Sequence, residues 1–289
     1  MRFGIIGNIK KPEVLETVKN ISKYLVSEKV EFYIEKKLSA KISKNNIFTK
    51  KNILSIENLI SSSDIIIACG GDGTILSTAN LINFKEIPIL GLNLGKLGFL
   101  TEASNENIYS FIKNIINHNY KIESRTVLEV SLNKKKYYGL NDVVIDKGIS
   151  SRIVKIKSLI NKSSLMDFIG DGIIISTPTG STGYGLASGG PIVAPNSEVF
   201  VLNPICAHSL SIRSLVVPDN CEIEILASSE NEKVRLTIDG QQKVFVNNIL
   251  KVKIKKAKHF VKLIKSNDSN YYDVLRKKLF WSFDTRTIK

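Results

Sequence analysis

Residues 70–74, with the sequence Gly-Gly-Asp-Gly-Thr, place a single carboxylate inside a turn of glycines. The apolar run 65–69 precedes this turn, and apolar residues at helical spacing follow it from Ile75 to Ile82. The pattern predicts a buried strand, a glycine turn and the beginning of a helix. Glycines let a ligand approach the backbone, and N–H groups at a helix N-terminus form an anion site. Phosphate is the obvious anion for such a site.

Asp72 is unexpected in an anion site, because a carboxylate repels phosphate. It could take a proton from an attacking hydroxyl group, or it could hold a metal ion. The alternative is that Asp72 is only a turn residue or a helix N-cap, since Asp-Gly pairs are common in turns. The turn alone does not choose between these interpretations.

A second glycine-rich stretch, residues 170–191, repeats this organisation. It begins with an apolar strand, Ile173 to Ser176, and continues into a polar loop. The loop supplies hydroxyl groups and accessible backbone from Thr177, Thr179, Gly180, Ser181, Thr182, Gly183 and Gly185. A loop with so many hydroxyl groups and glycines is poorly suited to a purely structural role. Two such loops in one chain suggest a nucleotide held between two domains.

Residues 70–74, the pair Asn141-Asp142 and residues 170–191 together resemble the NAD kinase family, whose members phosphorylate NAD to NADP. The turn at 70–74 is also similar to that of 6-phosphofructokinases and of diacylglycerol and sphingosine kinases. The stretch from Asp171 to Tyr184 is much more specific, and the resemblance extends from the first strand to the C-terminal tail. It implies an NAD kinase that uses ATP or polyphosphate. Mg²⁺ or another divalent cation would accompany ATP, and no tightly bound prosthetic group is expected.

The resemblance gives Asp72 the role of general base. Asp72 would take the proton from the 2′-hydroxyl on the adenosine side of NAD while that oxygen attacks the γ-phosphate. The backbone around Gly71 and Gly73, together with the loop from Thr179 to Thr182, would cradle the donor phosphates.

The family carries Asn followed by an acid at the positions of Asn141 and Asp142, as a contact to the dinucleotide. Asp142 would accept hydrogen bonds from ribose hydroxyls, and Asn141 would read a base or amide edge. The alternative is a turn pair at the beginning of a strand. Taken without the rest of the motif set, the two residues favour this alternative.

Other positions match nucleotide contacts of the family. Asp171 and Tyr184 correspond to residues near the nicotinamide half, and Tyr184 can stack on a ring. Phe99 would pack by the adenine, unless it is an ordinary core residue. Arg152 matches a basic position that comes partly from a neighbouring subunit. The remaining expected contacts are Thr179, Thr182, Gly183, Gly185, Leu186, Ala187, Cys206 and Gln241.

The elements that position these residues fall into two groups. Residues 1–120 alternate strand and helix, which predicts an α/β domain with a Rossmann-like parallel sheet. Within it Pro12 suits a first helical position, and Ser104 could cap a helix whose apolar stripe runs from Ile108 to Ile116. From residue 121 the hydrophobic period changes to two, so residues 121–266 are expected to form a β-rich, β-sandwich-like domain. Residues 267–289, helical from Tyr271 to Leu279, are expected to return to the first domain, as in the family.

The composition is that of an ordinary globular protein, with 43% hydrophobic and 24% charged residues among 289. The longest apolar runs are too short to span a membrane. Cys69, Cys206 and Cys221 lack paired spacing, which suits a reducing cytoplasm. The net charge of +14 suits either a phosphate-rich partner or a solvated basic surface, and no nucleic-acid-binding motif appears. We therefore expect a cytoplasmic protein with small-molecule substrates and no nucleic-acid or membrane partner. The family resemblance also implies that the chain assembles as a homodimer or homotetramer.

Two other functions remain open at this point. A lipid kinase of the diacylglycerol or sphingosine type would share the glycine turn and the two-domain plan, but it would not require Asn141-Asp142 or Tyr184. A dinucleotide-sensing module would keep the pocket without turnover. Asp72 argues against a sensor, because phosphate binding alone is better served by a neutral residue.

Overall fold

The computed structural model describes residues 1–42, 48–95, 98–148 and 153–281. The chain divides into two compact units. Unit 1 contains Met1–Ser124 and the chain from Val261 onward, and unit 2 contains Arg125–Phe260. The sequence predicts these boundaries after residues 120 and 266, and the structure assigns two short additional segments, 121–124 and 261–266, to unit 1.

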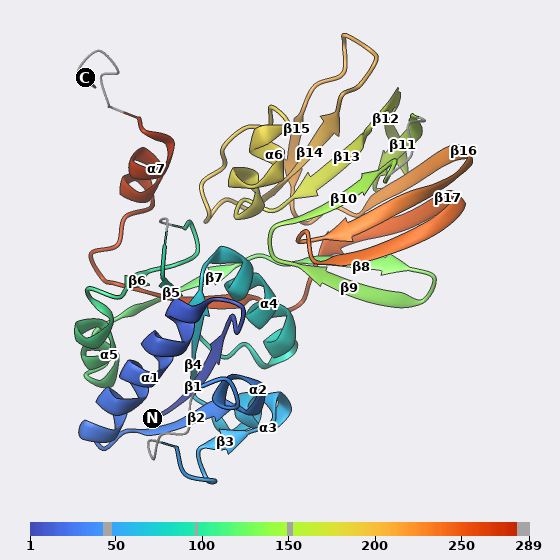
Figure 1. Ribbon diagram of the computed structural model, residues 1–289. Helices are drawn as coiled ribbons and strands as arrows, with labels where there is room; N and C mark the ends of the chain where they lie inside the picture. Colours follow the sequence, from blue (N-terminus) through green and yellow to red (C-terminus); the bar gives the residue numbers. More distant parts are fainter. Residues whose placement is uncertain (43–47, 96–97, 149–152, 282–289) are drawn as a thin grey trace. The chain divides into compact units, whose positions relative to one another are not determined.

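Unit 1 is an α/β structure built on a largely parallel sheet (Figure 1). Its strands lie in the order β3-β2-β1-β4-β5-β18-β7, and β6 pairs with β5. These strands are β1 (Arg2–Gly7), β2 (Glu31–Glu35), β3 (Ile53–Leu54), β4 (Ile65–Gly70), β5 (Ile89–Asn93), β6 (Ala103–Ser104), β7 (Lys121–Arg125) and β18 (Val261–Lys265). The helices are α1 (Pro12–Ser27), α2 (Lys36–Ser39), α3 (Ile56–Ser62), α4 (Asp72–Ile82), η1 (Asn83–Lys85), α5 (Ile108–Ile116) and α7 (Tyr271–Leu279).

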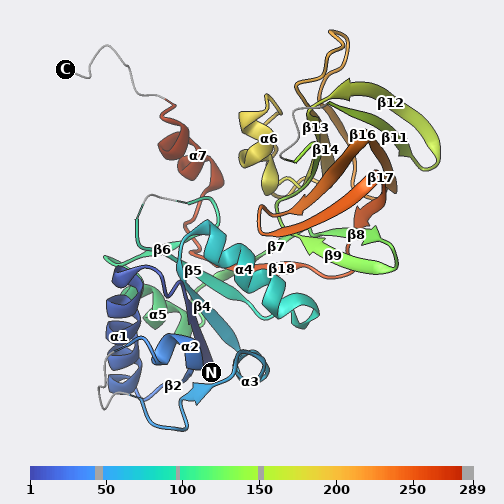
Figure 2. The same ribbon diagram turned by 45° about the vertical axis from the view of Figure 1, so that its right-hand side comes forward.

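Helices cover both faces of this sheet, with α1 and α5 on one side and α3 and α4 on the other (Figure 2). The first face forms one hydrophobic core, in which Phe3 and Ile5 of β1 meet Val18 and Ile21 of α1. On the second face two glycines permit close approach of the helices. A Cβ at Gly4 would lie 2.6 Å from a methyl group of Leu59, and one at Gly91 would lie 2.3 Å from Ile75.

The C-terminal part of the chain completes the sheet of unit 1. Strand β18 lies between β5 and β7. Its last residue, Lys265, is buried and forms an ion pair of 2.9 Å with Glu102. Glu102 also accepts hydrogen bonds from the backbone of Ser266 and from the hydroxyl of Ser269, both at 3.1 Å. These bonds tie the segment that leads into α7 to the loop after β5.

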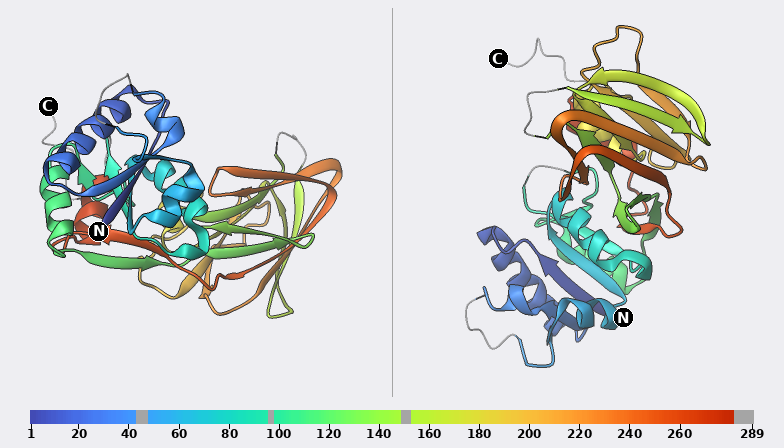
Figure 3. Two further views of the ribbon diagram at one scale, coloured as in Figure 1. Left: turned by 90° about the horizontal axis from the view of Figure 1, so that it is seen from below. Right: turned by 90° about the vertical axis from the view of Figure 1, so that its right-hand side faces the viewer.

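Unit 2 is a curled antiparallel sheet in the order β15-β14-β13-β10-β16-β17-β8-β9, with β11 joined to β12 and β16 (Figure 3). Its strands are β8 (Leu128–Leu132), β9 (Lys135–Gly139), β10 (Asp142–Asp146), β11 (Val154–Ile160), β12 (Ser163–Gly170), β13 (Gly172–Ser176), β14 (Val199–Ile205), β15 (Leu215–Pro218), β16 (Ile223–Ile238) and β17 (Gln242–Lys256). Two short helical turns, η2 (Gly180–Thr182) and α6 (Tyr184–Ala187), follow β13.

The long strand β16 explains why this sheet curls. Its first half pairs with β11 and its second half pairs with β10, while β17 runs along both halves. Inward-facing side chains from all these strands, such as Val143, Ile156, Ile173, Phe200 and Leu250, meet in one core. The unit is therefore one continuous hydrogen-bonded sheet wrapped around its own core.

Most sequence predictions about the fold are confirmed, namely the parallel α/β domain, the β-rich domain, Pro12 at the beginning of α1 and the helix Tyr271–Leu279. One is wrong in detail. Asn107, not Ser104, is the N-cap of α5, and its side-chain oxygen accepts the backbone N–H of Ser104 at 2.7 Å. No helix among the described residues is long and apolar enough to cross a membrane.

Candidate functional site

The glycine turn joins β4 to α4 at the carboxyl end of the parallel strands. Gly71 is the N-cap of α4, and its carbonyl accepts the backbone N–H groups of Thr74 at 2.9 Å and Ile75 at 3.2 Å. Asp72 is the first helical residue. The interpretation of Asp72 as the N-cap is therefore wrong, because Gly71 occupies that position. The first turn of α4 offers the expected environment for an anion.

The carboxylate of Asp72 is fixed by the segment that follows β5. Its Oδ2 atom accepts the backbone N–H of Phe99 at 2.9 Å, and its Oδ1 atom accepts that of Leu100 at 3.1 Å. Gly98 allows this approach, since a Cβ there would lie 2.0 Å from Oδ1 of Asp72. The backbone N–H of Gly98 is in turn donated to the hydroxyl of Thr101 at 3.2 Å. Asp72 is thus held in one orientation.

Phe99 lies directly beside this carboxylate and is half-buried. The ammonium group of Lys278, on α7, lies 5.0 Å from the centroid of its ring. Phe99 is therefore not a residue of the hydrophobic core, and its ring is in contact with the C-terminal helix. The structure brings Asp72, its flanking glycines and Phe99 together within unit 1.

In unit 2 the pair Asn141-Asp142 is held by an acid that the sequence had not singled out. Asp239 accepts the backbone N–H groups of Leu140, Asn141 and Asp142 at 2.8, 2.7 and 3.1 Å. Asp239 and Gly240 have positive φ values of 50° and 67° in the turn between β16 and β17. An Asp-Gly dipeptide is typical of a turn, and nothing in the local sequence indicates that the carboxylate of Asp239 binds a segment about one hundred residues away.

The loop after β13 also forms hydrogen bonds to the backbone at Leu140 and Asn141. The hydroxyl of Thr177 donates to the carbonyl of Leu140 at 2.6 Å, and its backbone N–H donates to the carbonyl of Asn141 at 2.9 Å. Gly180 is required there, because a Cβ would lie 1.9 Å from the carbonyl oxygen of Asn141. A Cβ at Gly183 would lie 3.6 Å from the carboxylate of Asp142. The two predicted motifs of unit 2 are therefore in direct contact and form one candidate site.

This candidate site contains buried polar atoms without hydrogen-bond partners in the part of the chain that the structure describes. The side-chain oxygen of Asn141 and the hydroxyl of Ser176 are buried and have no hydrogen-bond partner among the described residues. Burial, with a smaller contribution from the nearby Asp239, raises the pKa of Asp142 to about 7. Burial also raises the pKa of Asp239, although its three backbone hydrogen bonds oppose that shift. Unsatisfied buried polar groups beside a perturbed acid are typical of binding sites.

Residues 177–187 fold into short helical turns rather than an open loop. The hydroxyl of Thr182 donates to the carbonyl of Thr179 at 3.2 Å. Asn203 of β14 holds the second turn by donating to the carbonyls of Gly185 and Ser188 at 3.3 and 3.1 Å. Tyr184 begins α6 and is 47% exposed, so its ring is available to a ligand. Leu186 and Ala187 complete this helix.

Asp171 and Cys206 are adjacent, the first directly before β13 and the second directly after β14. The backbone N–H of Asp171 donates to the carbonyl of Ile205 at 2.9 Å, and its carboxylate pairs with Lys147 at 2.8 Å. Cys206 is an exposed free thiol with φ of 46°. Lys147 is a second residue that the sequence had not indicated. Gln241 lies on the β16–β17 turn, and Arg152 lies outside the described residues.

Sequence comparison gives the same assignment to both units. The family model of the ATP-NAD kinase N-terminal domain matches residues 3–120, and that of the ATP-NAD kinase C-terminal domain matches residues 140–266. The chain belongs to the NAD kinase family. An NAD kinase of Chloroherpeton thalassium is 36% identical over 285 residues, which cover 97% of this chain and 98% of the relative. One of Caldanaerobacter subterraneus is 38% identical over 283 residues, covering 96% and 98%.

Solved structures of the NAD kinase family share the fold. Yeast NADH kinase complexed with NADH has a TM-score of 0.89 at 25% identity, covering all of this chain and 90% of that one. An NAD kinase from Archaeoglobus fulgidus in complex with ATP has a TM-score of 0.78 at 26% identity, covering 97% and 99%. Together with the two family matches, these relatives confirm the predicted family and favour it over the lipid-kinase alternative.

Proposed function

We propose that this member of the NAD kinase family transfers the γ-phosphoryl group of ATP, or a phosphoryl group of polyphosphate, to the adenosine-ribose 2′-hydroxyl of NAD, forming NADP. It is a phosphotransferase with an alcohol as acceptor, in line with its family. The observation that carries the chemistry is the carboxylate of Asp72, which stands at the beginning of α4 and is oriented by two backbone N–H groups.

Asp72 acts as the general base in this proposal. Each of its oxygens accepts one backbone hydrogen bond, so each keeps a lone pair that can take a proton. The 2′-hydroxyl gives its proton to Asp72, its oxygen forms a bond to the γ-phosphorus, and the bond from that phosphorus to the β-phosphate oxygen breaks. ADP leaves with the electron pair. Phosphoryl transfer depends mainly on positioning and charge compensation, and a fixed base serves the positioning.

Asn141 and Asp142 supply the acceptor contacts in this proposal. The unpartnered side-chain oxygen of Asn141 can accept an N–H group of a base or amide edge. Asp142, in its ionised form, can accept hydrogen bonds from ribose hydroxyls. Support comes from the way Asp239 and Thr177 fix the backbone of this pair. Thr179, Thr182, Gly183, Gly185, Leu186, Ala187 and Gln241 remain proposed nucleotide contacts.

For the nicotinamide half we propose Asp171, Tyr184 and Cys206, and for the adenine Phe99. The exposed ring of Tyr184 can stack on a planar group, and the exposure of Cys206 leaves its position accessible. Gly71 and Gly73 are proposed to lie against donor phosphates, because a Cβ at either would meet only open space.

A divalent cation, Mg²⁺ in the simplest case, is proposed to arrive with the ATP phosphates as part of the substrate. It neutralises developing charge on the phosphoryl oxygens. We also propose a homodimer or homotetramer in the cytoplasm, with Arg152 acting partly across subunits. The family resemblance supports the assembly, and the exposed thiol of Cys206 suits a reducing compartment.

The test is NADP formation from NAD, with ATP and Mg²⁺ in one assay and polyphosphate in another. NADP in the first assay supports the proposal as stated. Product with polyphosphate alone would keep the acceptor and change the donor. Tight NAD binding without NADP from either donor would overturn the proposal in favour of a dinucleotide sensor.

A further inference from the structure

Unit 1 contains a pocket of about 520 Å³ at the carboxyl end of its sheet. It is lined by the loop after β1 from Asn8 to Lys11, by Glu35 and Lys37 next to the end of β2, and by one side of α4. Its volume falls in the usual range for small-molecule sites. The acceptor contacts proposed above in unit 2 include none of these residues.

The strand order explains why a pocket forms there. From β1 the sheet continues to β2 and β3 on one side and to β4 and β5 on the other. The connections after β1 and β4 therefore leave the sheet in opposite directions, which opens a crevice between their carboxyl ends. Ligands of open parallel sheets bind at such switch points. Gly7 at the end of β1 and Gly71 after β4 both line the pocket.

The wall of the pocket is suited to phosphate groups. Lys10, Lys11 and Lys37 all line it, and none of them forms an ion pair with a carboxylate of the described residues. The N-terminal turn of α4 contributes Gly71 and Gly73, where a Cβ would have no neighbour within 4 Å. The ammonium groups of these lysines and a helix N-terminus both favour an anion.

A buried hydroxyl group in the same wall also lacks a partner. Thr78 of α4 lines the pocket and is fully buried. Its Oγ1 atom has no hydrogen-bond partner among the described residues. A buried polar atom without a partner points to a group that enters from outside the protein.

Glu35 is the one acid among the residues that line this pocket. It is the last residue of β2 and precedes α2, yet its side chain makes no capping hydrogen bond. Burial raises the pKa of its carboxyl, and Lys37 opposes that shift. A carboxylate repels phosphate, so it has no use in a site for a bare phosphate chain. Glu35 lies at the end of β2, the strand that pairs with β1. In dinucleotide-binding sheets an acid at this position accepts hydrogen bonds from ribose hydroxyls.

We propose that this pocket binds the phosphoryl donor as a nucleoside triphosphate, with the ribose hydroxyls donating to Glu35 and the phosphates lying toward Lys10, Lys11 and the first turn of α4. The inference rests on the proposed function and specifies its donor. The residues on both sides of Asp72 line the pocket, while the carboxylate of Asp72 is bonded to the segment 98–100. The donor phosphates would therefore approach the glycine turn from the side of β1.

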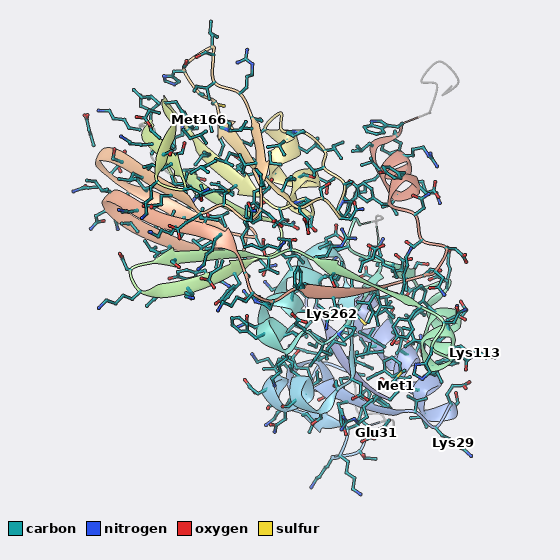
Figure 4. The ribbon with its side chains drawn as sticks, turned by 180° about the vertical axis from the view of Figure 1, so that it is seen from behind. Met1, Lys29, Glu31, Lys113, Met166 and Lys262 are labelled. Carbon is teal, nitrogen blue, oxygen red and sulfur yellow. The ribbon has the colours of Figure 1, made fainter. Side chains whose placement is uncertain are left out.

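The deciding variant is Glu35→Gln, assayed with ATP, 2′-deoxy-ATP, 3′-deoxy-ATP and polyphosphate. Losing the charged acceptor should raise the KM for ATP about tenfold, with kcat and the KM for NAD nearly unchanged. Wild-type enzyme should prefer ATP to at least one deoxy analogue, and the variant should lose that preference. The KM for polyphosphate should stay the same or fall. Glu31→Gln, at the opposite end of β2, is the matched control and should change none of these values (Figure 4).

The triple variant Lys10→Ala, Lys11→Ala, Lys37→Ala should raise the KM for ATP and for polyphosphate alike, by about tenfold or more. An unchanged KM for ATP in Glu35→Gln, or a retained preference over both deoxy analogues, would overturn the proposal. A raised Mg²⁺ requirement in Glu35→Gln with no change in ribose preference would also overturn it, because that result would assign Glu35 to the cation.

If wild-type protein forms no NADP at all, the donor site can still be tested by calorimetry with a non-hydrolysable ATP analogue, Mg²⁺ and saturating NAD. In that titration Glu35→Gln should bind about tenfold more weakly, and equal binding would overturn the proposal.

Discussion

Asp72 and Phe99 are joined by a hydrogen bond of 2.9 Å from the backbone N–H of Phe99 to the carboxylate of Asp72. The bond connects the first residue of α4 to the segment after β5, and Leu100 adds a second bond to the other oxygen. The proposed base and the residue proposed to contact adenine are therefore positioned by the same interaction. A change in either one is expected to affect the other.

The first prediction concerns Asp72→Asn, which removes the base while keeping the size of the side chain. We expect turnover to fall at least about a hundredfold, the usual scale for a general base. The amide nitrogen of Asn would also face one of the two backbone N–H groups, so one hydrogen bond is lost. The measurement is kcat for NADP formation, with the melting temperature measured beside it.

Thr101→Val separates these two effects. Thr101 accepts the N–H of Gly98 and so supports the same segment without contributing a base. This variant should lose less than about tenfold in turnover, the effect of one neutral hydrogen bond. Equal losses in the two variants would mean that Asp72 only orders the segment, and near-normal turnover in Asp72→Asn would rule out the base.

The second prediction concerns Asp239→Asn. Only one oxygen would remain for the three backbone N–H groups that Asp239 now accepts, so the pair Asn141-Asp142 should loosen. We expect the KM for NAD to rise about tenfold while the KM for ATP changes little. Removing the neighbouring negative charge should also move the pH dependence of NAD binding to lower pH, which a purely structural defect would not do. Asp167→Asn, an exposed acid of β12, is the control.

The third prediction is a pH dependence of stability. The pKa of Asp142 is about 7 in the folded protein and 3.8 in an unperturbed carboxyl, so the folded state keeps a proton that the unfolded state loses. The free energy of unfolding should therefore fall as the pH rises from about 4 to 7, by at most about 1.4 kcal/mol per pH unit from this group. Urea titrations at several pH values give the free energy of unfolding at each pH. This free energy should change less steeply with pH in Asp142→Asn than in the wild type. An identical pH dependence in both proteins would contradict the raised pKa of Asp142.

The fourth prediction concerns the buried ion pair between Lys265 and Glu102. Lys265→Met leaves the carboxylate of Glu102 buried without its cation, and we expect a loss of about 3 kcal/mol in the free energy of unfolding. Lys155→Met, which breaks an exposed pair with Glu230, should cost less than about 1 kcal/mol. Chemical denaturation of both variants provides the comparison. Similar losses would show that burial of the first pair carries no extra energy.

The sequence predicted the elements whose signals are local. The apolar run before Gly70, the helical spacing after it and the stripe of α5 each lie within a few residues, and each element is present. Asn141-Asp142 and the loop after Ser176 were recognised as separate motifs. Their union into one site follows from the antiparallel pairing of β10 with β13, which the sequence does not display.

What the sequence could not indicate are bonds between distant segments. Asp239 has the local signature of a hairpin turn, and its role depends on a contact across 98 positions with Asn141. Glu35 has the signature of a strand end, and it becomes notable only because β1 and β4 flank the switch point. The role of each of these two side chains depends on the strand order and not on its neighbours in the chain.

The position of β18 has a consequence for synthesis of the chain. Unit 2 is formed from a continuous segment, so it can fold as soon as residue 260 has left the ribosome. Unit 1 cannot complete its sheet until the strand Val261–Lys265 is available, and until then one edge of β5 lacks a partner that it has in the finished protein. An unpaired strand edge is a site of aggregation. A nascent chain that stops before Val261 should therefore carry a folded second unit on an unfinished, protease-sensitive first unit.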